Sequence, residues 1–255
     1  MRRGAALALL ALALPLLVGA AEPELVPDVS QRRIDIESGF TGEQLLLFGA
    51  ILYPGGRLPE GRVDVAVVVK GPTEAITVRE KQKLAGIWVN ADSSLFRSAP
   101  AYYAVAASRP IPQIVDPKTA AIYELGLANL QLSPVGTLDA ASIDRFTRGL
   151  VDLRRRAGLY REAEEPVEIT DGVLYRARLP LPASVPVGTY TAETFLITDG
   201  RVVAAESRDI VIGKTGFEQL VTILADRYGF FYGLIAVTLS LLFGWLAAVI
   251  ADRRR

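Results

Sequence analysis

Short apolar runs separated by turn residues fill the first half of the chain and predict β-strands. Residues 33–37 alternate between polar and apolar side chains, as a strand does when one of its faces is exposed to water. Residues 44–53 are almost continuously apolar and precede Pro54-Gly55-Gly56, so we expect a strand buried on both faces and then a turn. Further short strands are predicted at residues 63–69, 75–78, 87–90 and 102–107.

The apolar pattern changes to a helical period in the middle of the chain. Asp116 followed by Pro117 is typical of an N-cap and the first residue of a helix. Asp139 is a second N-cap candidate, because apolar residues at helical spacing follow it. Gly158 can end this second helix in the left-handed conformation. We therefore expect a two-helix insertion at about residues 116–158.

Strand patterns return at residues 173–179, 189–198 and 201–212. Asp199-Gly200 joins the last two runs and favours a two-residue hairpin turn, in which both positions need positive φ. These patterns predict a mainly β domain over residues 22–213, an immunoglobulin-like antiparallel β-sandwich with the helical insertion. Two separate β-domains joined by the helices are the alternative.

Both ends of the chain carry long apolar segments. Residues 1–21 combine two arginines, an apolar stretch too short to cross a bilayer and small residues at the end, which is the layout of a signal peptide. Residues 229–250 contain no charge and precede an arginine cluster, which predicts a transmembrane helix and a cytoplasmic tail at residues 251–255. We expect a single-pass protein with its bulk outside the cytoplasm.

Two further patterns lie near the predicted membrane span. Residues 214–228 have apolar side chains at helical spacing and predict a juxtamembrane amphipathic helix, which either lies on the lipid or packs under the domain. Within the span, small residues recur on one stripe, which allows close packing against a second copy of the chain or another membrane protein. The residues of this helix-packing stripe are Gly233, Ala236, Ser240, Gly244 and Ala248.

The composition restricts the chemistry of the protein. The 28 Lys and Arg balance the 28 Asp and Glu, so no net charge attracts nucleic acid. The chain has no cysteine and no histidine, which excludes thiol nucleophiles and Ser-His or Cys-His catalysis, and no phosphate-binding or calcium-binding motif occurs. We predict that the protein is not an enzyme, and no catalytic, cofactor-binding or metal-binding residues are assigned. A carboxylate enzyme such as a glycosidase would need two acids about 5–10 Å apart.

Aromatic and polar residues toward the end of the first half of the chain form a candidate recognition surface: Trp88, Asn90, Tyr102 and Tyr103. Trp and Tyr combine a flat apolar face with one polar group, which suits binding sites and β-sandwich cores alike, and core packing is the stronger interpretation of Trp88 and Tyr103. A second candidate is the set of arginines on the second helix, which could hold an anion. The alternative is a solvated face on which they pair with Asp144 and Asp152.

Several short motifs resemble the alphaproteobacterial putative transmembrane protein family. They are, in order, Leu47-Phe48-Gly49-Ala50, Gly71-Pro72, Gly86-Ile87-Trp88-Val89-Asn90, Ala99-Pro100 and Gly158-Leu159-Tyr160, followed by the C-terminal span. The resemblance implies a Gram-negative inner-membrane protein with a periplasmic domain, and it carries over no catalytic residue. It also points to a transporter partner, because relatives lie beside sulfite-exporter-like permeases.

These observations favour a membrane-anchored periplasmic accessory protein that contacts the lipid bilayer and a membrane-protein partner or a second copy of itself. The alternative is a periplasmic receptor for a small ligand or anion near Trp88, Asn90 and the arginines.

Overall fold

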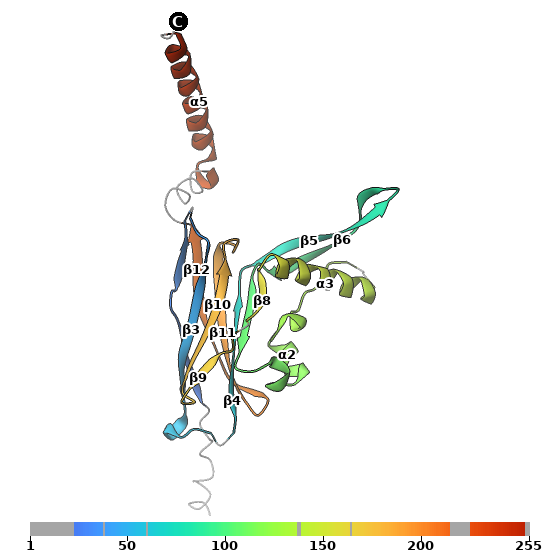
Figure 1. Ribbon diagram of the computed structural model, residues 1–255, viewed down its shortest axis with the longest axis vertical. Coiled ribbons are helices and arrows are strands. Elements are labelled where there is room, and N and C mark those ends of the chain that lie inside the picture. Colours follow the sequence, from blue (N-terminus) through green and yellow to red (C-terminus); the bar gives the residue numbers. More distant parts are fainter. Residues whose placement is uncertain are drawn as a thin grey trace, which may run out of the picture.

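The computed structural model describes residues 23–37, 39–59, 61–136, 139–163, 165–214 and 225–252 (Figure 1). Within these ranges the chain is mainly β, with one long apolar helix at its C-terminal end. The predicted signal peptide lies outside the described residues, as does most of the predicted juxtamembrane helix.

Two sheets make up the β domain. The four-stranded sheet has the order β1 (Glu24–Val29), β3 (Gly42–Leu52), β10 (Leu174–Pro182) and β9 (Glu168–Thr170), and all its neighbours are antiparallel. The six-stranded sheet has the order β2 (Arg33–Ile36), β12 (Arg201–Lys214), β11 (Gly188–Thr198), β4 (Val63–Lys70), β7 (Tyr103–Ala107) and β8 (Tyr160–Glu162). The β2–β12 and β7–β8 pairs are parallel, so the expectation of wholly antiparallel pairing is wrong at both edges of this sheet.

The buried side chains of both sheets form one continuous hydrophobic cluster. Every residue from Val65 to Val69 of β4 is buried, so this inner strand between β11 and β7 is covered on both faces, one of them by the segment that follows β7. Tyr123 of that segment contacts the Phe195 ring of β11 with 5.3 Å between ring centroids. The unbroken apolar run Val65-Ala66-Val67-Val68-Val69 fits a strand that is covered on both sides.

Both helices begin where the sequence predicts them. In α2 (Pro117–Ile122), Asp116 accepts a hydrogen bond from the Thr119 amide at 2.8 Å. In α3 (Ala140–Arg156), Asp139 accepts one from the Ser142 amide at 2.6 Å, and Gly158 follows the helix with φ of 72°. Short 3₁₀ turns lie at η2 (Pro54–Gly56), η3 (Ile111–Gln113) and η4 (Leu127–Asn129).

The turn between β11 and β12 also follows its sequence. Asp199 and Gly200 have φ of 50° and 80°, so the predicted two-residue hairpin is confirmed. Both angles lie in the left-handed region that the Asp-Gly dipeptide tolerates.

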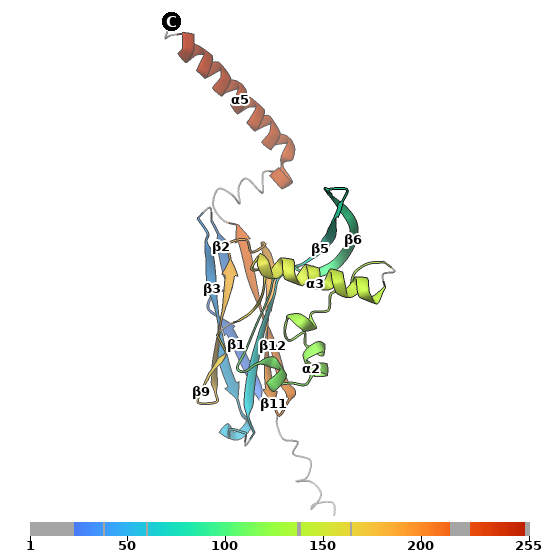
Figure 2. The ribbon, with the colours of Figure 1, turned by 45° about the vertical axis from the view of Figure 1, so that its right-hand side comes forward.

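The hairpin of β5 (Thr73–Leu84) and β6 (Ile87–Pro100) differs most from expectation. The sequence predicts short sandwich strands at residues 75–78 and 87–90, but β5 and β6 are long and pair with each other in a separate two-stranded sheet. Figures 1 and 2 show this hairpin leaving the domain beside α3 and ending well away from the other sheets. We call it the arm, and its free end, residues 81–90, the arm tip.

Candidate functional site

Basic side chains of α3 hold the lower part of the arm. The Arg145 guanidinium lies 3.2 Å from Glu80 of β5 and 3.1 Å from Asp92 of β6, and Arg154 forms an ion pair with Glu74 near the base of β5. These cations therefore have carboxylate partners on the arm, which the sequence did not reveal because the partners are more than fifty residues away along the chain.

The remaining arginines of α3 divide into two groups. Arg148 pairs with Asp144, and Arg156 pairs with Asp152 at 2.6 Å, so the predicted solvated face with helical ion pairs is confirmed for these residues. Arg155 instead lines a polar cavity.

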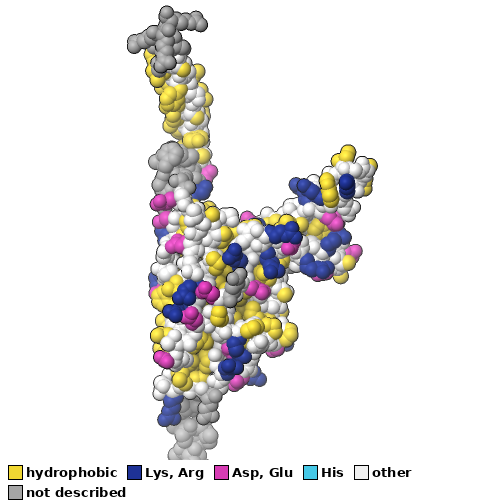
Figure 3. Space-filling view, in the orientation of Figure 1, with side chains coloured by type: hydrophobic (Ala, Val, Ile, Leu, Met, Phe, Trp, Pro, Cys, Tyr) yellow, Lys and Arg dark blue, Asp and Glu magenta, His cyan; other side chains and the backbone are white. Residues whose placement is uncertain are grey.

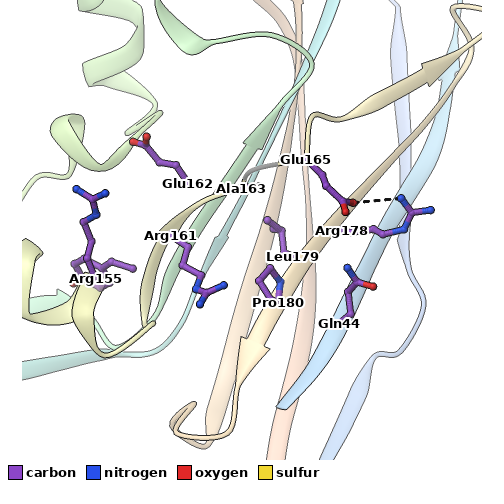
Figure 4. A pocket seen from close by; sticks show the side chains of 10 residues that line it. Gln44, Arg155, Arg161, Glu162, Ala163, Glu165, Arg178, Leu179 and Pro180 are labelled. Atoms are coloured by element: carbon purple, nitrogen blue, oxygen red, sulfur yellow. Dashed lines mark ion pairs between the residues drawn. The ribbon is translucent and has the colours of Figure 1, made fainter. Parts of the chain in front are cut away.

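This cavity has a volume of about 400 Å³ and opens between β8, the end of α3 and the β3–β10 pair (Figure 4). Arg155, Arg161 and Arg178 reach its walls, but their guanidinium groups point in different directions (Figure 4). Arg178 lies 3.6 Å from both Glu165 and Glu168. An anion site needs cations that converge on one point, and this arrangement does not supply them.

Apolar packing also holds the lower part of the arm. Phe96 and Val78 are buried, and so is Ser94, which lies opposite Val78 in the hairpin. Val135 donates its amide to the Leu95 carbonyl at 2.7 Å, which ties the chain before α3 to the outer edge of β6. A free two-stranded hairpin is only marginally stable in water, and these contacts explain how the arm keeps its shape.

The arm tip begins at a break in the strand pairing. Glu80 pairs with Asp92 but Lys81 pairs with Asn90, so the register skips Ala91. Such a β-bulge bends and twists a hairpin, and here it separates the part held by Arg145 from the part that is free. The hairpin closes at Ala85 and Gly86, which have φ of 49° and 89°.

Large apolar side chains of the arm tip face solvent. Leu84, Ile87 and Trp88 are 64%, 69% and 64% exposed, although side chains of this size are usually buried. Lys83 lies directly opposite Trp88 across the hairpin, and Lys81 lies opposite Asn90. Figure 3 shows apolar and basic side chains together at the end of the arm.

The four residues of the predicted recognition surface lie in two different environments. Trp88 and Asn90 are exposed on the arm tip, so the core position that the sequence favoured for Trp88 is wrong. Tyr102 and Tyr103 are fully buried, as the core interpretation of Tyr103 expected, and their hydroxyls donate to the carbonyls of Pro180 and Glu124 at 2.8 and 2.6 Å. A single surface containing all four residues is therefore ruled out.

A partly buried charge cluster closes the end of β4. Lys70 Nζ lies 2.7 Å from Glu124 and 3.1 Å from Glu193. Burial alone would lower the pKa of Lys70, but the hydrogen bond from Lys70 to Glu124 and the charge of Glu193 outweigh burial and raise it. Burial would likewise raise the pKa of Glu124, whereas the hydrogen bonds from Lys70 and the Gln131 amide lower it. Both groups therefore stay charged at neutral pH, which suits a structural ion pair and not a proton-transferring one.

Helix α5 (Gly229–Asp252) is long and apolar enough to cross a membrane, and none of the described part of its span is buried. On an α-helix Gly233, Ser240 and Gly244 fall on one face, and Ala236 lies beside them. A Cβ atom added at Gly233 or Gly244 would meet no other atom within 4 Å among the described residues. The Ser240 hydroxyl donates to the Ala236 carbonyl at 2.9 Å, so it does not project from the helix as an unsatisfied group. The side chain of Ala248 lies outside the described residues.

Among the described residues no group of three or more acidic side chains is placed to hold a metal ion.

The sequence matches the family model described as "Putative transmembrane protein (Alph_Pro_TM)" over residues 24–253. No curated protein matches the chain. The family match begins with β1 and extends through α5, so it includes the β domain, the arm and the apolar helix.

Proposed function

The chain belongs to this family of transmembrane proteins, and on that premise we propose that it is a single-pass accessory protein that binds another membrane protein through α5. In this proposal the β domain lies in the periplasm of a Gram-negative bacterium and α5 spans the inner membrane. The signal-like residues 1–21 and the three arginines after α5 support this orientation, because positive charges are retained on the cytoplasmic side.

One observation carries the proposal: the small-residue face of α5 is open. Lipid tails are as apolar as leucine, so helices in a bilayer associate where small side chains let their backbones approach. Gly233, Ser240 and Gly244 form such a face, whereas Leu234, Leu242 and Trp245 lie away from it on an α-helix. A partner helix would fill a groove that the described part of this chain leaves empty.

The partner class that fits is an integral membrane protein. A transporter is one candidate, and a second copy of this chain is the other. The β domain, with its paired arginines and the ion pairs of Lys70, would then act as a non-catalytic unit held beside that partner.

Co-purification tests this function. The full chain, expressed in its native host and extracted in mild detergent, is expected to bring down a defined membrane protein or to migrate as an oligomer. Gly244→Leu fills the groove and is expected to reduce that association several-fold. Thr238→Leu is the matched control, because Thr238 lies on the opposite side of the helix and its hydroxyl donates only to its own helix, at 2.8 Å to the Leu234 carbonyl.

Two results would overturn the proposal. One is a monomer without a partner from both the wild-type chain and the Gly244→Leu variant. The other is equal loss of association in Gly244→Leu and Thr238→Leu, since a specific helix face cannot give that pattern. A fluorescent reporter fused after Arg255 tests the orientation, and it should be visible only if that end is cytoplasmic.

A further inference from the structure

The chemistry of the arm tip matches the interfacial zone of a lipid bilayer. Tryptophan is enriched at the depth of the headgroups, where its ring contacts the acyl chains and its N–H contacts water or phosphate. Lysines beside such residues keep their ammonium groups at the anionic headgroups. Trp88, Leu84 and Ile87 lie close to Lys81 and Lys83, because all five residues belong to the short end of the hairpin.

The order of these residues along the arm suits end-on contact with lipid. Leu84 and Ile87 pair directly before the turn, and Lys83 and Trp88 form the next pair back. Because side chains alternate between the two faces of a hairpin, these two pairs cover both faces of its end. Lys81 lies three residues before Leu84, about 10 Å along the strand, and would stay at the headgroups when the end enters the bilayer.

Strand topology places the arm and the anchor at the same end of the domain. β4 and β12 both pair antiparallel with β11, so they run in the same direction. The arm begins after Lys70 at the end of β4, and the chain continues toward α5 after Lys214 at the end of β12. Figures 1 and 2 agree that the arm points toward this end.

The lengths allow the arm tip to reach the membrane. From Thr73 to Leu84 the hairpin extends about 36 Å, at about 3.3 Å per residue. Residues 215–228 connect β12 to α5, and a fully extended segment of that size spans at most about 50 Å. The domain is thus tethered within reach of the bilayer at the end where the arm projects.

We propose that the arm tip inserts into the headgroup region of the leaflet that faces the β domain and gives the domain a second membrane contact besides α5. A single spanning helix attaches the chain to the membrane at one place only and does not by itself fix the orientation of the domain. A second contact fixes its orientation, because α3 holds the arm to the domain through Arg145 and Arg154. The inference uses the membrane anchorage of the chain but not the partner of α5.

A protein partner fits the arm tip less well. A specific protein interface buries about 800 Å² on each partner and involves about 20–30 residues a side. The arm tip offers only residues 81–90, on a hairpin that is open on both faces. Strand addition to β5 is also disfavoured there, because Lys81 and Lys83 on an exposed strand are typical of edges protected against pairing.

Tryptophan fluorescence of the full chain tests the proposal directly. The chain has 2 tryptophans, Trp88 and Trp245, so a Trp245→Phe variant leaves Trp88 as the only one. This protein is reconstituted in vesicles of phosphatidylethanolamine and phosphatidylglycerol, with or without lipids brominated near the top of the acyl chains. If the arm tip inserts into lipid, the brominated lipids should quench Trp88. Acrylamide should then quench Trp88 several-fold less than it quenches free tryptophan in water.

Matched substitutions separate insertion from nonspecific effects. Leu84→Asp together with Ile87→Asp places charges at the end of the arm and is expected to restore acrylamide access to Trp88. Leu174→Asp is the control, because Leu174 is also an exposed leucine, 56% accessible, but lies on β10 away from the arm. Lys81→Glu with Lys83→Glu should reduce lipid quenching in anionic vesicles and change it less in phosphatidylcholine vesicles.

Two quenching results would overturn the inference. Trp88 that is open to acrylamide and unaffected by brominated lipid lies in water. Trp88 that is shielded from both quenchers is covered by protein and not by lipid. A normal thermal unfolding transition of the charged variants shows that the domain is intact. The Gly244→Leu variant, which tests the helix partner, should leave the quenching of Trp88 unchanged, so the two proposals fail independently.

Discussion

The guanidinium of Arg145 on α3 lies 3.1 Å from the carboxylate of Asp92 on β6. The same guanidinium lies 3.2 Å from Glu80, which is the residue opposite Asp92 on β5. One side chain therefore links both strands of the arm to the body of the domain, directly below the bulge at which the arm tip begins. This bridge decides whether the arm tip moves with the domain or independently of it.

We predict that Arg145→Gln loosens the arm tip without unfolding the domain. The Arg145 side chain is about half exposed, and a pair of this kind contributes about 0.5–1 kcal/mol, so amide hydrogen exchange in residues 81–90 should become about two- to five-fold faster. Exchange in β4 should not change. Mass spectrometry of the full chain in detergent measures both.

Arg148→Gln is the control for this effect. Arg148 lies on the same helix but pairs with Asp144 one turn away, so its loss removes a helical ion pair and no contact with the arm. Equal exchange rates in the two variants would show that the bridge does not hold the arm.

The arm also shows the limit of what the sequence predicts. The segment around residues 79–83 is almost entirely polar and charged, which suits a strand exposed on both faces and not one in a sandwich. That signal could have indicated that the hairpin leaves the sheet. The carboxylate partners of Arg145 and Arg154 could not be found in this way, because they depend on where α3 packs and not on any local pattern.

Features set by the backbone were predictable for local reasons. Asp116, Asp139 and Asp199-Gly200 each fix a helix start or a turn within four residues of chain, so the sequence alone suffices. The two parallel edge pairings depend on contacts between distant segments, and no local pattern distinguishes β2 beside β12 from an antiparallel neighbour. The burial of Tyr102 has the same origin, since its hydroxyl partner Pro180 is distant in the sequence.

Gly49 gives a test of close packing in the four-stranded sheet. A Cβ atom at this position would lie 2.5 Å from the Val26 carbonyl oxygen and 2.6 Å from the Tyr175 hydroxyl. β3 is the central strand between β1 and β10, so neither neighbour can retreat without breaking the pairing. We predict that Gly49→Ala destabilises the domain by about 3 kcal/mol, as overpacking against backbone does.

The matched control is Gly213→Ala, also in a β-strand. There the added Cβ would come no closer than 3.6 Å to an arginine side chain, so the free energy of unfolding should change by less than about 0.5 kcal/mol. Urea unfolding followed by circular dichroism in detergent measures both variants. A stable Gly49→Ala variant would contradict the packing of Tyr175 over this glycine.

Phe96 tests whether the base of the arm is part of the domain core. Its side chain is 1% exposed, whereas that of its neighbour Leu95 is 38% exposed. We predict that Phe96→Ala costs about 3–4 kcal/mol of unfolding free energy, the usual effect of removing a buried aromatic ring. Leu95→Ala, one position along the same strand, should cost less than about 1 kcal/mol. Similar costs for the two would mean that the arm does not pack on the domain as described.

Asp64 gives a prediction about pH. Burial would raise the pKa of this carboxyl, but hydrogen bonds from Arg109 and Ser108 outweigh burial and hold the pKa below its usual value. The Ser108 hydroxyl lies 2.7 Å from the Asp64 carboxylate, and the Arg109 Nε lies 2.9 Å from it. These contacts join the start of β4 to the end of β7.

A carboxyl group whose pKa is lower in the folded state favours folding above the pKa of the unfolded chain. Its contribution is lost as the pH falls toward the folded value, because the unfolded state takes up the proton first. Arg109→Gln removes the main cause of this shift. We therefore predict that the stability difference between the wild-type chain and Arg109→Gln is largest at pH 7 and shrinks as the pH falls below about 4, the usual range of an aspartate pKa.

Thermal unfolding of the full chain in detergent at a series of pH values measures this difference. Arg33→Gln is the matched control, because Arg33 pairs at 2.9 Å with Asp35 on the exposed surface. The difference between the wild-type chain and this control should stay small at every pH, since exposed pairs are screened by water. A difference for Arg109→Gln that is constant from pH 7 to pH 3 would mean that Arg109 stabilises the β4–β7 junction by packing, and not through the charge of Asp64.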